Sequence, residues 1–482
     1  MKKQHLDKII SLCKRKGFVF PNSEIYGGLK ASYDYGPLGV ELKKSISELW
    51  WKEMTQSHQN IVGLDSAIMV HPDVWEASGH IANFNDPMTD NKDNKKRYRI
   101  DDLLSQQKSK VIDAICVALK MDSTNNDDIY NDIAHTLLSD GSKSDNVLQE
   151  AGVIDPFSGA IGKWTPAVQF NLMFKTDSGP SEKTGKHIYL RPETAQGMFI
   201  NYLLVQNTMR LKVPFGIAQI GKAFRNEIVA RNFIFRTREF EQMEMQYFVH
   251  PSKDVESMDL WKEKRLDFYL NHLGINAENL KFHQHSKDAL AHYAKDAYDI
   301  EYNFPFGWGE VEGIHNRTDF DLKQHENLSG KNMTYFDTKA QEKYHPYIIE
   351  TSTGLNRLFL MVLCEAYFED TDNNRVVLQL PYELAPIKAV ICPLVKKDGL
   401  PEKAMSVFKT LNQEFSCIYD EQGSIGKRYY RQDEAGTPFG ITLDHQTLED
   451  NSVTIRERDS MKQTRISIDT ISSFIEDNKQ EN

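Results

Sequence analysis

The sequence predicts an α+β protein with an antiparallel sheet flanked by helices, a helical insertion, and a separate α/β domain at the C-terminus. Two segments of alternating residues, 215–227 and 235–249, are joined by a short link, which is typical of an antiparallel strand pair. Polar helical patterns occupy about 84–165 and interrupt the first domain. After Pro381, apolar strands alternate with helices, which indicates an α/β domain.

These patterns divide the chain into four segments. Residues 1–83 and 166–381 would form the two parts of one main domain, 84–165 an inserted module, and 382–482 the C-terminal domain. At roughly 150 residues per domain, a chain of 482 residues is expected to hold about three domains, which agrees with this division.

The first segment contains a long helix that begins at Pro37, after Gly36 breaks the preceding chain. Trp51 and Met54 add apolar residues to its second side, so this helix needs a partner on more than one side, and a subunit interface is one possibility. Its main apolar stripe follows the spacing i, i+4, i+7, i+8 and consists of Leu42, Ile46, Leu49 and Trp50.

The second part of the main domain reads mainly as strands. Residues 252–300 are mostly helical in pattern, and 346–368 read as a strand followed by a helix. The shorter strand-like segments are 168–175, 187–190 and 307–313.

Composition indicates an ordinary globular protein, with 40 % hydrophobic and 11 % aromatic residues, and excludes disordered and fibrous classes. Apolar runs such as Leu358–Cys364 are far shorter than the roughly 18 residues of a membrane helix, and the N-terminus lacks the apolar stretch of a signal peptide. The 5 cysteines are odd in number and widely spaced, so neither a disulfide framework nor a zinc site is indicated. We therefore expect a soluble, cytoplasmic protein with no membrane partner and no zinc.

Charge by itself argues weakly against a nucleic-acid partner. The chain has 58 Lys and Arg against 69 Asp and Glu, a net charge of −11, whereas binding to phosphates depends on basic residues. Because local basic tracks can exist on an acidic protein, net charge does not decide the question.

Polar residues share one side of the second strand of the predicted pair. This is poor material for a core, so it indicates either a site or a solvated sheet face with ion pairs. On the preceding strand Ala223, Arg225 and Glu227 also share a side. The alternation places Arg236, Arg238, Phe240, Gln242, Glu244 and Gln246 on one side, and Phe235, Thr237, Met243 and Met245 on the other.

Two further segments carry charge in strand-like text. In GEVEG (309–313) the spacing places Glu310 and Glu312 on one side of a strand. In ETSTGLNR (350–357) a strand ends in a carboxylate and hydroxyls, and a helix then begins with Arg357 in its first turn. A helix N-terminus with an added arginine favours a phosphate or another anion, although Thr353 as an N-cap and Arg357 as a surface residue would explain the same pattern.

Several long motifs resemble a known family. FRNE followed by FRTREFEQMEMQYF resembles motif 2 of the class II aminoacyl-tRNA synthetases, GLNR resembles motif 3, and the helix at Pro37 resembles motif 1. YLRPETAQGMF, FPFGWGEVEGIHNRTDFDL, YDEQGSIGKRYYRQDEAGTPFG and VTIRERDSMKQTR narrow the match. Together, and in this order, they are similar to the homodimeric glycyl-tRNA synthetases over nearly the whole chain.

The resemblance implies a ligase that joins glycine to ATP as glycyl-adenylate and then transfers glycine to the 3′ end of tRNA(Gly). It implies catalytic roles for Arg225, Glu227 and Arg357, with Phe240 under the adenine, Arg357 above it, and Mg²⁺ on Glu310 beside the triphosphate. The implied ATP-binding residues are Arg225, Asn226, Glu227, Phe235, Arg236, Thr237, Arg238, Glu239, Phe240, Glu310, Val311, Gly354, Leu355, Asn356 and Arg357.

The resemblance also implies a glycine pocket lined with carboxylates for the ammonium group, in which lack of space excludes larger amino acids. The implied glycine-binding residues are Arg99, Glu193, Phe240, Glu241, Gln242, Met243, Glu244, Arg317, Glu350, Thr351, Ser352, Thr353 and Gly354.

The C-terminal segment resembles an anticodon-binding domain. It implies RNA contacts by Lys427, Arg428 and Arg431, interleaved with tyrosines on which bases can stack, and by Arg231 in the motif 2 loop. Arg456 and Arg458 share a strand side, which fits either RNA binding or a charged edge strand.

The partners are thus expected to be glycine, ATP, tRNA(Gly) and a second copy of the chain. Two other readings remain at this point. One is an accessory protein that kept the fold and lost catalysis, and the other is a class II ligase for threonine, proline or histidine.

Overall fold

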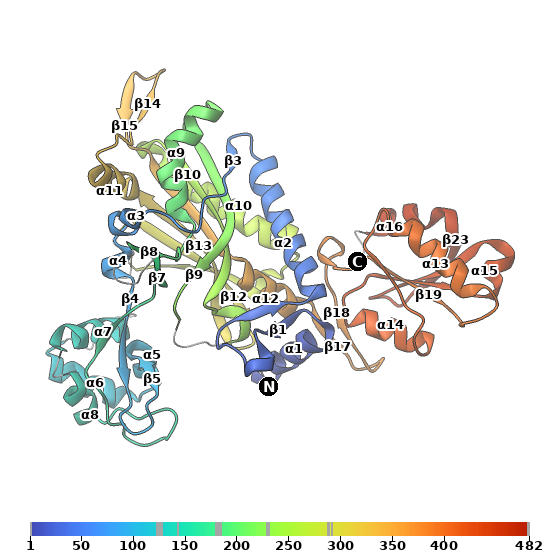
Figure 1. Ribbon diagram of the computed structural model, residues 1–482, viewed down its shortest axis with the longest axis horizontal. Helices are drawn as coiled ribbons and strands as arrows, with labels where there is room; N and C mark the ends of the chain where they lie inside the picture. Colours follow the sequence, from blue (N-terminus) through green and yellow to red (C-terminus); the bar gives the residue numbers. More distant parts are fainter. Residues whose placement is uncertain are drawn as a thin grey trace.

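The computed structural model describes residues 2–121, 129–141, 144–178, 186–227, 232–286, 290 and 293–479. Figure 1 shows a central domain, a mainly helical lobe at its lower left that contains the inserted module, and a C-terminal domain at the right. Among the described residues no helix is long and apolar enough to cross a membrane.

The central domain is built on a seven-stranded sheet. From β11 to β9 every pair of neighbouring strands is antiparallel, and only the edge strand β3 runs parallel to its neighbour, β9. This confirms the predicted fold class. In spatial order the strands are β11 (Leu280–Gln284), β12 (Asp296–Phe304), β13 (Gly307–Thr318), β16 (Tyr347–Gly354), β10 (Glu239–Val249), β9 (Phe215–Phe224) and β3 (Ile61–Gly63).

The predicted pair 215–227 and 235–249 is present as β9 and β10, with Phe240 opposite Ala223. Both strands are shorter than predicted, because Phe233–Phe235 forms a 3-10 turn before β10 begins. The alternation expected for 235–238 is therefore wrong, and Phe235, Arg236 and Thr237 all line one cavity.

The expectation that Glu310 and Glu312 share one side of β13 is also wrong. Glu310 is opposite Glu301 while Glu312 is opposite Ile300, so Val311 is an extra residue in the ladder. Such a β-bulge reverses the alternation of side chains along a strand. Glu310 consequently lines the cavity, whereas Glu312 is fully buried behind the sheet.

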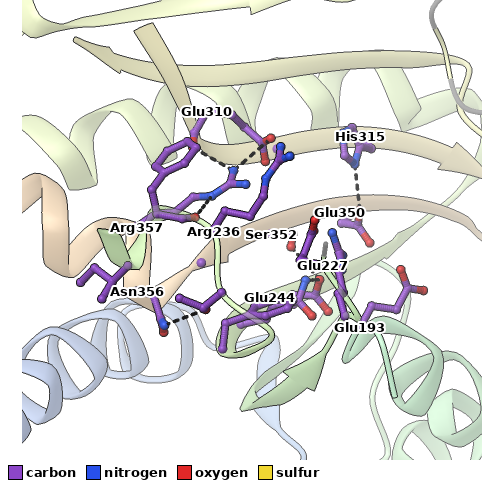
Figure 2. Close-up of a pocket in the computed structure, with 18 of the residues that line it drawn as sticks. Glu193, Glu227, Arg236, Glu244, Glu310, His315, Glu350, Ser352, Asn356 and Arg357 are labelled. Carbon is purple, nitrogen blue, oxygen red and sulfur yellow. Dashed lines mark hydrogen bonds and ion pairs between the residues drawn. The ribbon is translucent and has the colours of Figure 1, made fainter. Parts of the chain in front are cut away.

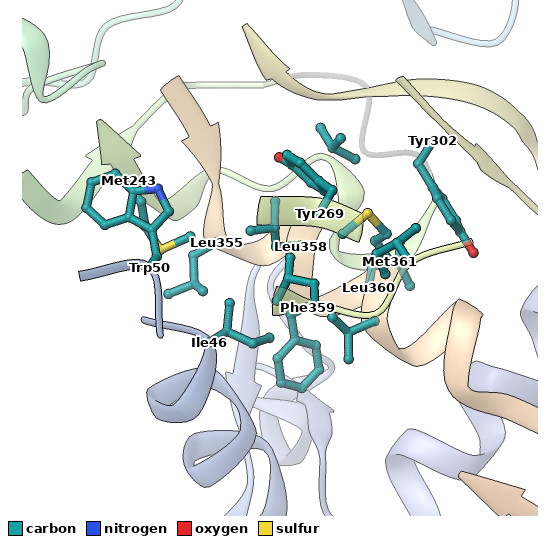
Figure 3. Close-up of a cluster of buried hydrophobic side chains, with 14 of the residues drawn as sticks. Ile46, Trp50, Met243, Tyr269, Tyr302, Leu355, Leu358, Phe359, Leu360 and Met361 are labelled. Atoms are coloured by element: carbon teal, nitrogen blue, oxygen red, sulfur yellow. The ribbon is translucent and has the colours of Figure 1, made fainter. Parts of the chain in front are cut away.

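The largest core lies behind the sheet, where helices cover the apolar side chains of β10, β13 and β16 (Figure 3). Met243 and Met245 of β10 are fully buried against Trp50 and other residues of the helix that begins at Pro37. Fully burying one such side chain contributes about 1.5–3 kcal/mol, so this core holds the sheet in place. The helices are α1 (Lys2–Lys16), α2 (Pro37–Gln56), α10 (Asp254–Asp267) and α12 (Leu355–Ala366).

A second layer of helices packs at the other end of the sheet. Phe199 and Tyr202 join Phe215, Phe248 and Leu322 in a separate buried cluster. The helices here are α9 (Ala195–Met209) and α11 (Phe320–Ser329), with the short α3 (Pro72–Ala77) and α4 (His80–Asn83) beside them. Near them a hairpin of β14 (Tyr335–Asp337) and β15 (Glu342–Tyr344) projects from the domain (Figure 1).

The inserted module has its own buried cluster, which includes Ile115, Ile133, Leu137 and Trp164. Its helices are α5 (Ile100–Leu104), α6 (Ser109–Leu119), α7 (Ile129–Asp140) and α8 (Ser144–Glu150). A small sheet of β5 (Arg97–Arg99), β4 (Asn85–Asp90) and β6 (Val168–Asn171) joins it to the central domain, followed by the hairpin of β7 (Lys175–Ser178) and β8 (Lys186–Tyr189).

The C-terminal domain is a five-stranded α/β unit, as predicted. Its strands lie in the order β20 (Cys417–Tyr419), β19 (Ala389–Pro393), β21 (Phe439–Leu443), β22 (Ser452–Glu457) and β23 (Gln463–Ser467), and β19 is parallel to both of its neighbours. Its helices are α13 (Leu400–Leu411), α14 (Ile425–Asp433), α15 (His445–Asp450) and α16 (Ile471–Asn478). Arg375 of β18 (Arg375–Leu378), which pairs with β17 (Tyr367–Asp370), reaches Asp433 of α14 in a buried ion pair and ties this domain to the central one.

One buried charge network connects three elements behind the sheet. Arg265 of α10 has no exposed side-chain surface, and it donates from Nε to Glu312 Oε1 at 2.6 Å and from NH1 to Glu53 Oε2 at 3.1 Å. Since Glu53 belongs to α2 and Glu312 to β13, the pairs fix these elements relative to one another.

We expect Arg265→Ala to destabilise the central domain by about 3–5 kcal/mol, because it leaves the Glu312 carboxylate buried without its positively charged partner. Thermal unfolding followed by circular dichroism measures the change. The control is Lys253→Ala, which removes an exposed pair with Glu256 and should change stability by less than about 1 kcal/mol. Equal melting temperatures for the two variants would contradict the assigned role of Arg265.

Candidate active site

A cavity of about 240 Å³ opens on the front of the central sheet, opposite the core. Figure 2 shows carboxylates gathered at one end and arginines at the other. The lining side chains come from β10, β13, β16, the segment before α9, the segments after β9 and before β10, the segment before β12, and the start of α12. They are Glu193, Arg225, Glu227, Ile234, Phe235, Arg236, Thr237, Phe240, Gln242, Glu244, Tyr293, Glu310, Gly313, His315, Arg317, Glu350, Ser352, Gly354, Asn356 and Arg357.

Glu244 is at the centre of the carboxylate end. It is buried, and its Oε1 accepts hydrogen bonds from Ser352 Oγ at 2.6 Å and from Gln242 Nε2 at 3.0 Å. Thr194 Oγ1 donates to its other oxygen. Burial, reinforced by the charges of Glu350 and Glu193, raises the pKa of Glu244 to about 7.

Glu350 is held on the neighbouring strand β16 by three donors. His315 Nδ1 lies 2.8 Å from its Oε1, while Gln246 Nε2 donates to Oε2 at 2.7 Å and Arg317 NH1 at 3.2 Å. Burial by itself would raise the pKa of Glu350, but Arg317 and His315 outweigh it and lower that pKa. Glu350 is therefore ionised at neutral pH.

Glu193 comes from the segment before α9 and completes the group. It accepts a hydrogen bond from Gln196 Nε2 at 3.0 Å and lies 3.4 Å from His80 Nε2. Although burial opposes ionisation, the charges of His80 and Arg317 and the Gln196 bond lower the pKa of Glu193. Three carboxylates that converge on one small space favour a cationic ligand such as an ammonium group.

The arginine end has the opposite character. The Arg225 guanidinium lies 5.3 Å from the ring centre of Phe240, and its Nε donates to Pro192 O at 3.1 Å. Arg357, in the first turn of α12, pairs with Glu310 at 3.1 Å, and this pairing lowers the pKa of Glu310. With Arg236 also on the lining, this end favours an anion such as a polyphosphate.

The predicted position of Arg357, above an adenine that rests on Phe240, stays a prediction. Arg357 lies over Phe235 at 4.4 Å, whereas Arg225 lies over Phe240. The reason is the ion pair with Glu310, together with the bond from Arg357 NH1 to Glu310 O at 2.9 Å, which draws Arg357 toward β13.

Some predicted site residues have side chains behind the sheet. These residues are buried in the core because of strand alternation, the β-bulge in β13, or a position on the inward side of α12. Their side chains therefore do not contact a ligand in the cavity, and only contact through their backbone remains a prediction. They are Met243, Val311, Thr351, Thr353 and Leu355.

Other predicted residues use their charges outside the cavity. Glu239 pairs with Lys222, and Glu241 pairs with Lys43 at 2.7 Å. Arg99, at the base of the inserted module, pairs with Asp101 at 2.7 Å and Asp86 at 3.4 Å.

Two residues next to the cavity donate hydrogen bonds to backbone carbonyls. Arg238 Nε donates to Glu227 O at 3.0 Å, and the backbone N–H of Asn226 donates to Leu172 O at 2.7 Å. Arg231 lies outside the described residues.

Sequence reasoning missed several lining residues, among them His315 and Tyr293. His315 is two residues before Arg317 on the same strand, so strand periodicity from the predicted Arg317 would have indicated it. Tyr293 stacks on the Arg317 guanidinium at 3.8 Å from a segment without strand or helix pattern, and nothing in the sequence identifies it.

The C-terminal domain divides its cations into two groups. Lys427, Tyr430 and Arg431 line a surface depression together with Lys16 of α1. Arg428 is buried, and its guanidinium donates to the carbonyls of Pro393 and Gly423, so the direct RNA contact expected of it is wrong.

Arg456 and Arg458 are also buried. They pair with Asp433 at 2.9 Å and Asp459 at 2.6 Å, which makes them structural residues rather than an exposed RNA surface.

Comparison with known proteins gives two family matches. Residues 174–367 match the tRNA synthetase class II core domain (G, H, P, S and T), and residues 388–478 match the anticodon binding domain. Among solved structures, prolyl-tRNA synthetase from Cryptosporidium parvum has a TM-score of 0.62 at 13 % identity and covers 98 % of this chain and 77 % of its own, which supports the fold.

Full-length relatives are much closer in sequence. A glycine–tRNA ligase of Chlorobaculum tepidum is 49 % identical over 478 residues, covering 98 % of this chain and 99 % of the relative. One of Treponema denticola is 51 % identical over 469 residues, covering 96 % and 94 %. One of Macrococcus caseolyticus is 48 % identical and covers 99 % of both chains. By these matches along its whole length, the chain belongs to the glycine–tRNA ligase family of the class II aminoacyl-tRNA synthetases.

Proposed function

We propose that this chain joins glycine to ATP and transfers the glycyl group to tRNA(Gly). The observation that carries the proposal is one cavity with Glu193, Glu244 and Glu350 clustered at one end and Arg236 and Arg357 at the other (Figure 2), and with Arg225 also on its lining. A glycine zwitterion and a triphosphate fit these two ends with their charges matched.

In the proposed first step a carboxylate oxygen of glycine attacks the α-phosphorus of ATP, and pyrophosphate leaves with the electrons of the broken P–O bond. Glu193, Glu244 and Glu350 would hold the ammonium group. Arg225 would bridge the glycine carboxylate and the α-phosphate, where negative charge must be stabilised as the new bond forms. Positioning and charge stabilisation are thus the main contributions of the protein.

The remaining cavity residues would bind the nucleotide. Phe240 offers a ring for the adenine, Glu227 an acceptor for its amino group, and Arg357 a cation for the γ-phosphate. Since Arg357 lies in the first turn of α12, the positive end of that helix adds to its effect.

We include a Mg²⁺ ion with the ATP. The Glu310 carboxylate is half-exposed and faces the cavity, and one carboxylate plus triphosphate oxygens is a donor set that suits Mg²⁺. Among the described residues no group of three or more His, Cys, Asp or Glu side chains forms a metal site, so the nucleotide would supply most ligands. When bound, the ion neutralises charge on the triphosphate.

Selection of glycine would rest on lack of space. Glu244, Ser352 and His315 line the cavity, and they would surround the α-carbon of a glycine whose ammonium group meets the carboxylates. An added methyl group would have to displace packed and hydrogen-bonded side chains, which is costly.

We further propose that Lys427 and Arg431 contact the tRNA, that two copies of the chain form the active enzyme, and that it acts in the cytoplasm. A non-catalytic accessory role is not favoured, because Arg225, Glu227, Glu310 and Arg357 all line the cavity.

We expect the purified protein to exchange labelled pyrophosphate into ATP with glycine, and at least about 100-fold more slowly with alanine or serine.

Arg225→Ala should reduce glycine-dependent exchange by about 10²–10³, since it removes a group aimed at developing charge. Folded protein that shows no glycine-dependent exchange would exclude the proposed activity.

We expect the KM for glycine to depend on pH through Glu244, whose pKa is raised to about 7. Only the ionised carboxylate attracts the ammonium group, so glycine binds better above this pKa, and the KM should rise as pH falls from about 8 to 6. Glu244→Gln should give a high KM with a weaker pH dependence. The control is Glu256→Gln, an exposed residue, and a wild-type KM that is constant over this range would refute the assignment.

We expect Lys427→Ala and Arg431→Ala to raise the KM for tRNA about threefold to tenfold at low salt and by a smaller factor at higher salt, with exchange unchanged, because each variant loses a salt-dependent phosphate contact. The matched control is Lys409→Ala, an exposed lysine on α13 of the same domain. Loss of exchange in either variant, or charging equal to that of the control, would argue against an RNA contact at this surface.

A further inference from the structure

The segment from Trp75 to Phe84, just before the inserted module, contacts the residues of both ends of the cavity. It contains the end of α3 and the short α4, and Figure 1 shows these helices between the central domain and the module. Neither His80 nor Phe84 lines the cavity, but each touches a side chain that does.

His80 contacts the carboxylate end. Its Nε2 lies 3.4 Å from Glu193 Oε2, and its Nδ1 lies 2.8 Å from Ser78 Oγ, so both ring nitrogens have a polar partner. The ring packs edge-on against Trp75, which is fully buried, and its side chain is 14 % exposed. The imidazole is therefore fixed in orientation, and it fixes the Glu193 carboxylate.

Phe84 contacts the arginine end. The Arg225 guanidinium lies 5.4 Å from the ring centre of Phe84 and 5.3 Å from that of Phe240, so two aromatic rings flank it. The Phe84 ring in turn lies 5.4 Å from the His80 ring.

The backbone reinforces this contact. Leu172 N–H donates to Phe84 O at 3.1 Å, and Asn226 N–H donates to Leu172 O at 2.7 Å. The residue that follows Arg225 is thus linked to Phe84 through a single intermediate residue at the base of the inserted module.

The residues that His80 and Phe84 contact are linked through adjacent positions of the chain. Glu193, which pairs with His80, follows Pro192, whose carbonyl accepts from Arg225 Nε. From this arrangement we infer that His80 and Phe84 are positioning residues of the activation step, His80 for the ammonium-binding Glu193 and Phe84 for the phosphate-binding Arg225. The inference rests on the proposed function and adds a segment outside the cavity to its machinery.

Because His80 and Phe84 act on different residues of the site, the loss of each should change different kinetic constants. His80 acts through Glu193, so its loss changes the binding of glycine and leaves the binding of ATP unchanged. Phe84 acts through Arg225, which bridges the glycine carboxylate and the α-phosphate, so its loss lowers kcat more than it raises the KM for glycine. A segment that only stabilised the fold would change all constants together with the melting temperature.

The test measures steady-state glycine-dependent pyrophosphate exchange, with melting temperatures for every variant. Phe84→Leu should lower kcat about fivefold with a KM for glycine within about twofold, and Phe84→Tyr, which keeps the ring, should restore it. The matched control is Phe170→Leu, because Phe170 stacks on Arg97 of the inserted module at 5.8 Å and not on the site.

For the other end, His80→Ala should raise the KM for glycine about tenfold with a KM for ATP within about twofold, and Ser78→Ala should give a smaller change in the same direction. The matched control is His345→Ala. His345 Nε2 lies 2.9 Å from Glu326 Oε2, and neither of these two residues lines the cavity.

The outcomes separate the two proposals. Wild-type protein without glycine-dependent exchange would overturn the proposed function and this inference with it. Active wild type, with Phe84→Leu and His80→Ala equal to their controls, would overturn the inference alone. So would losses that fall equally on kcat and on both KM values with a lowered melting temperature, since they would mark a purely structural role.

Discussion

The constraint on which the structure depends is that the central sheet has one apolar and one polar side. Met243 and Met245 must face α2 and α12 to form the core, so Gln242, Glu244 and Gln246 necessarily face the front. These polar groups are buried there, and hydrogen bonds stabilise them. Glu244 accepts from Gln242 of its own strand, from Thr194 before α9 and from Ser352 of β16, while Gln246 donates to Glu350 of β16. The same alternation that builds the core thus concentrates charge in the cavity.

Partial neutralisation makes this concentration of charge tolerable. Glu350 is offset by Arg317 and His315, and Glu193 by His80. Glu244 has only neutral hydrogen-bond donors, which is why its pKa is the one that rises. The uncompensated charge of the site is therefore localised, and a cationic ligand would complete the balance.

The net charge of −11 does not indicate whether the chain binds RNA. In the C-terminal domain Arg428, Arg456 and Arg458 bind carbonyls and carboxylates inside the fold, whereas Lys427 and Arg431 remain at the surface beside Lys16. Some cations hold the domain together inside the fold, and others lie at its surface, where Arg431 pairs with Asp420 at 3.3 Å. Only burial distinguishes the two groups.

The sequence by itself determined the fold class, the β9–β10 pair, the C-terminal α/β domain, the family, and the residues Glu193, Arg225, Glu244, Glu350 and Arg357, because alternation and long motifs are local properties of the chain. Only the tertiary structure decided what depends on departures from regular geometry or on contacts between distant segments. The bulge at Val311 separated Glu310 from Glu312, and the 3-10 turn at Phe233–Phe235 brought four consecutive residues, 234–237, to the cavity. The contacts of His80 with Glu193 and of Phe84 with Arg225 join residues more than 100 positions apart, which no local pattern encodes.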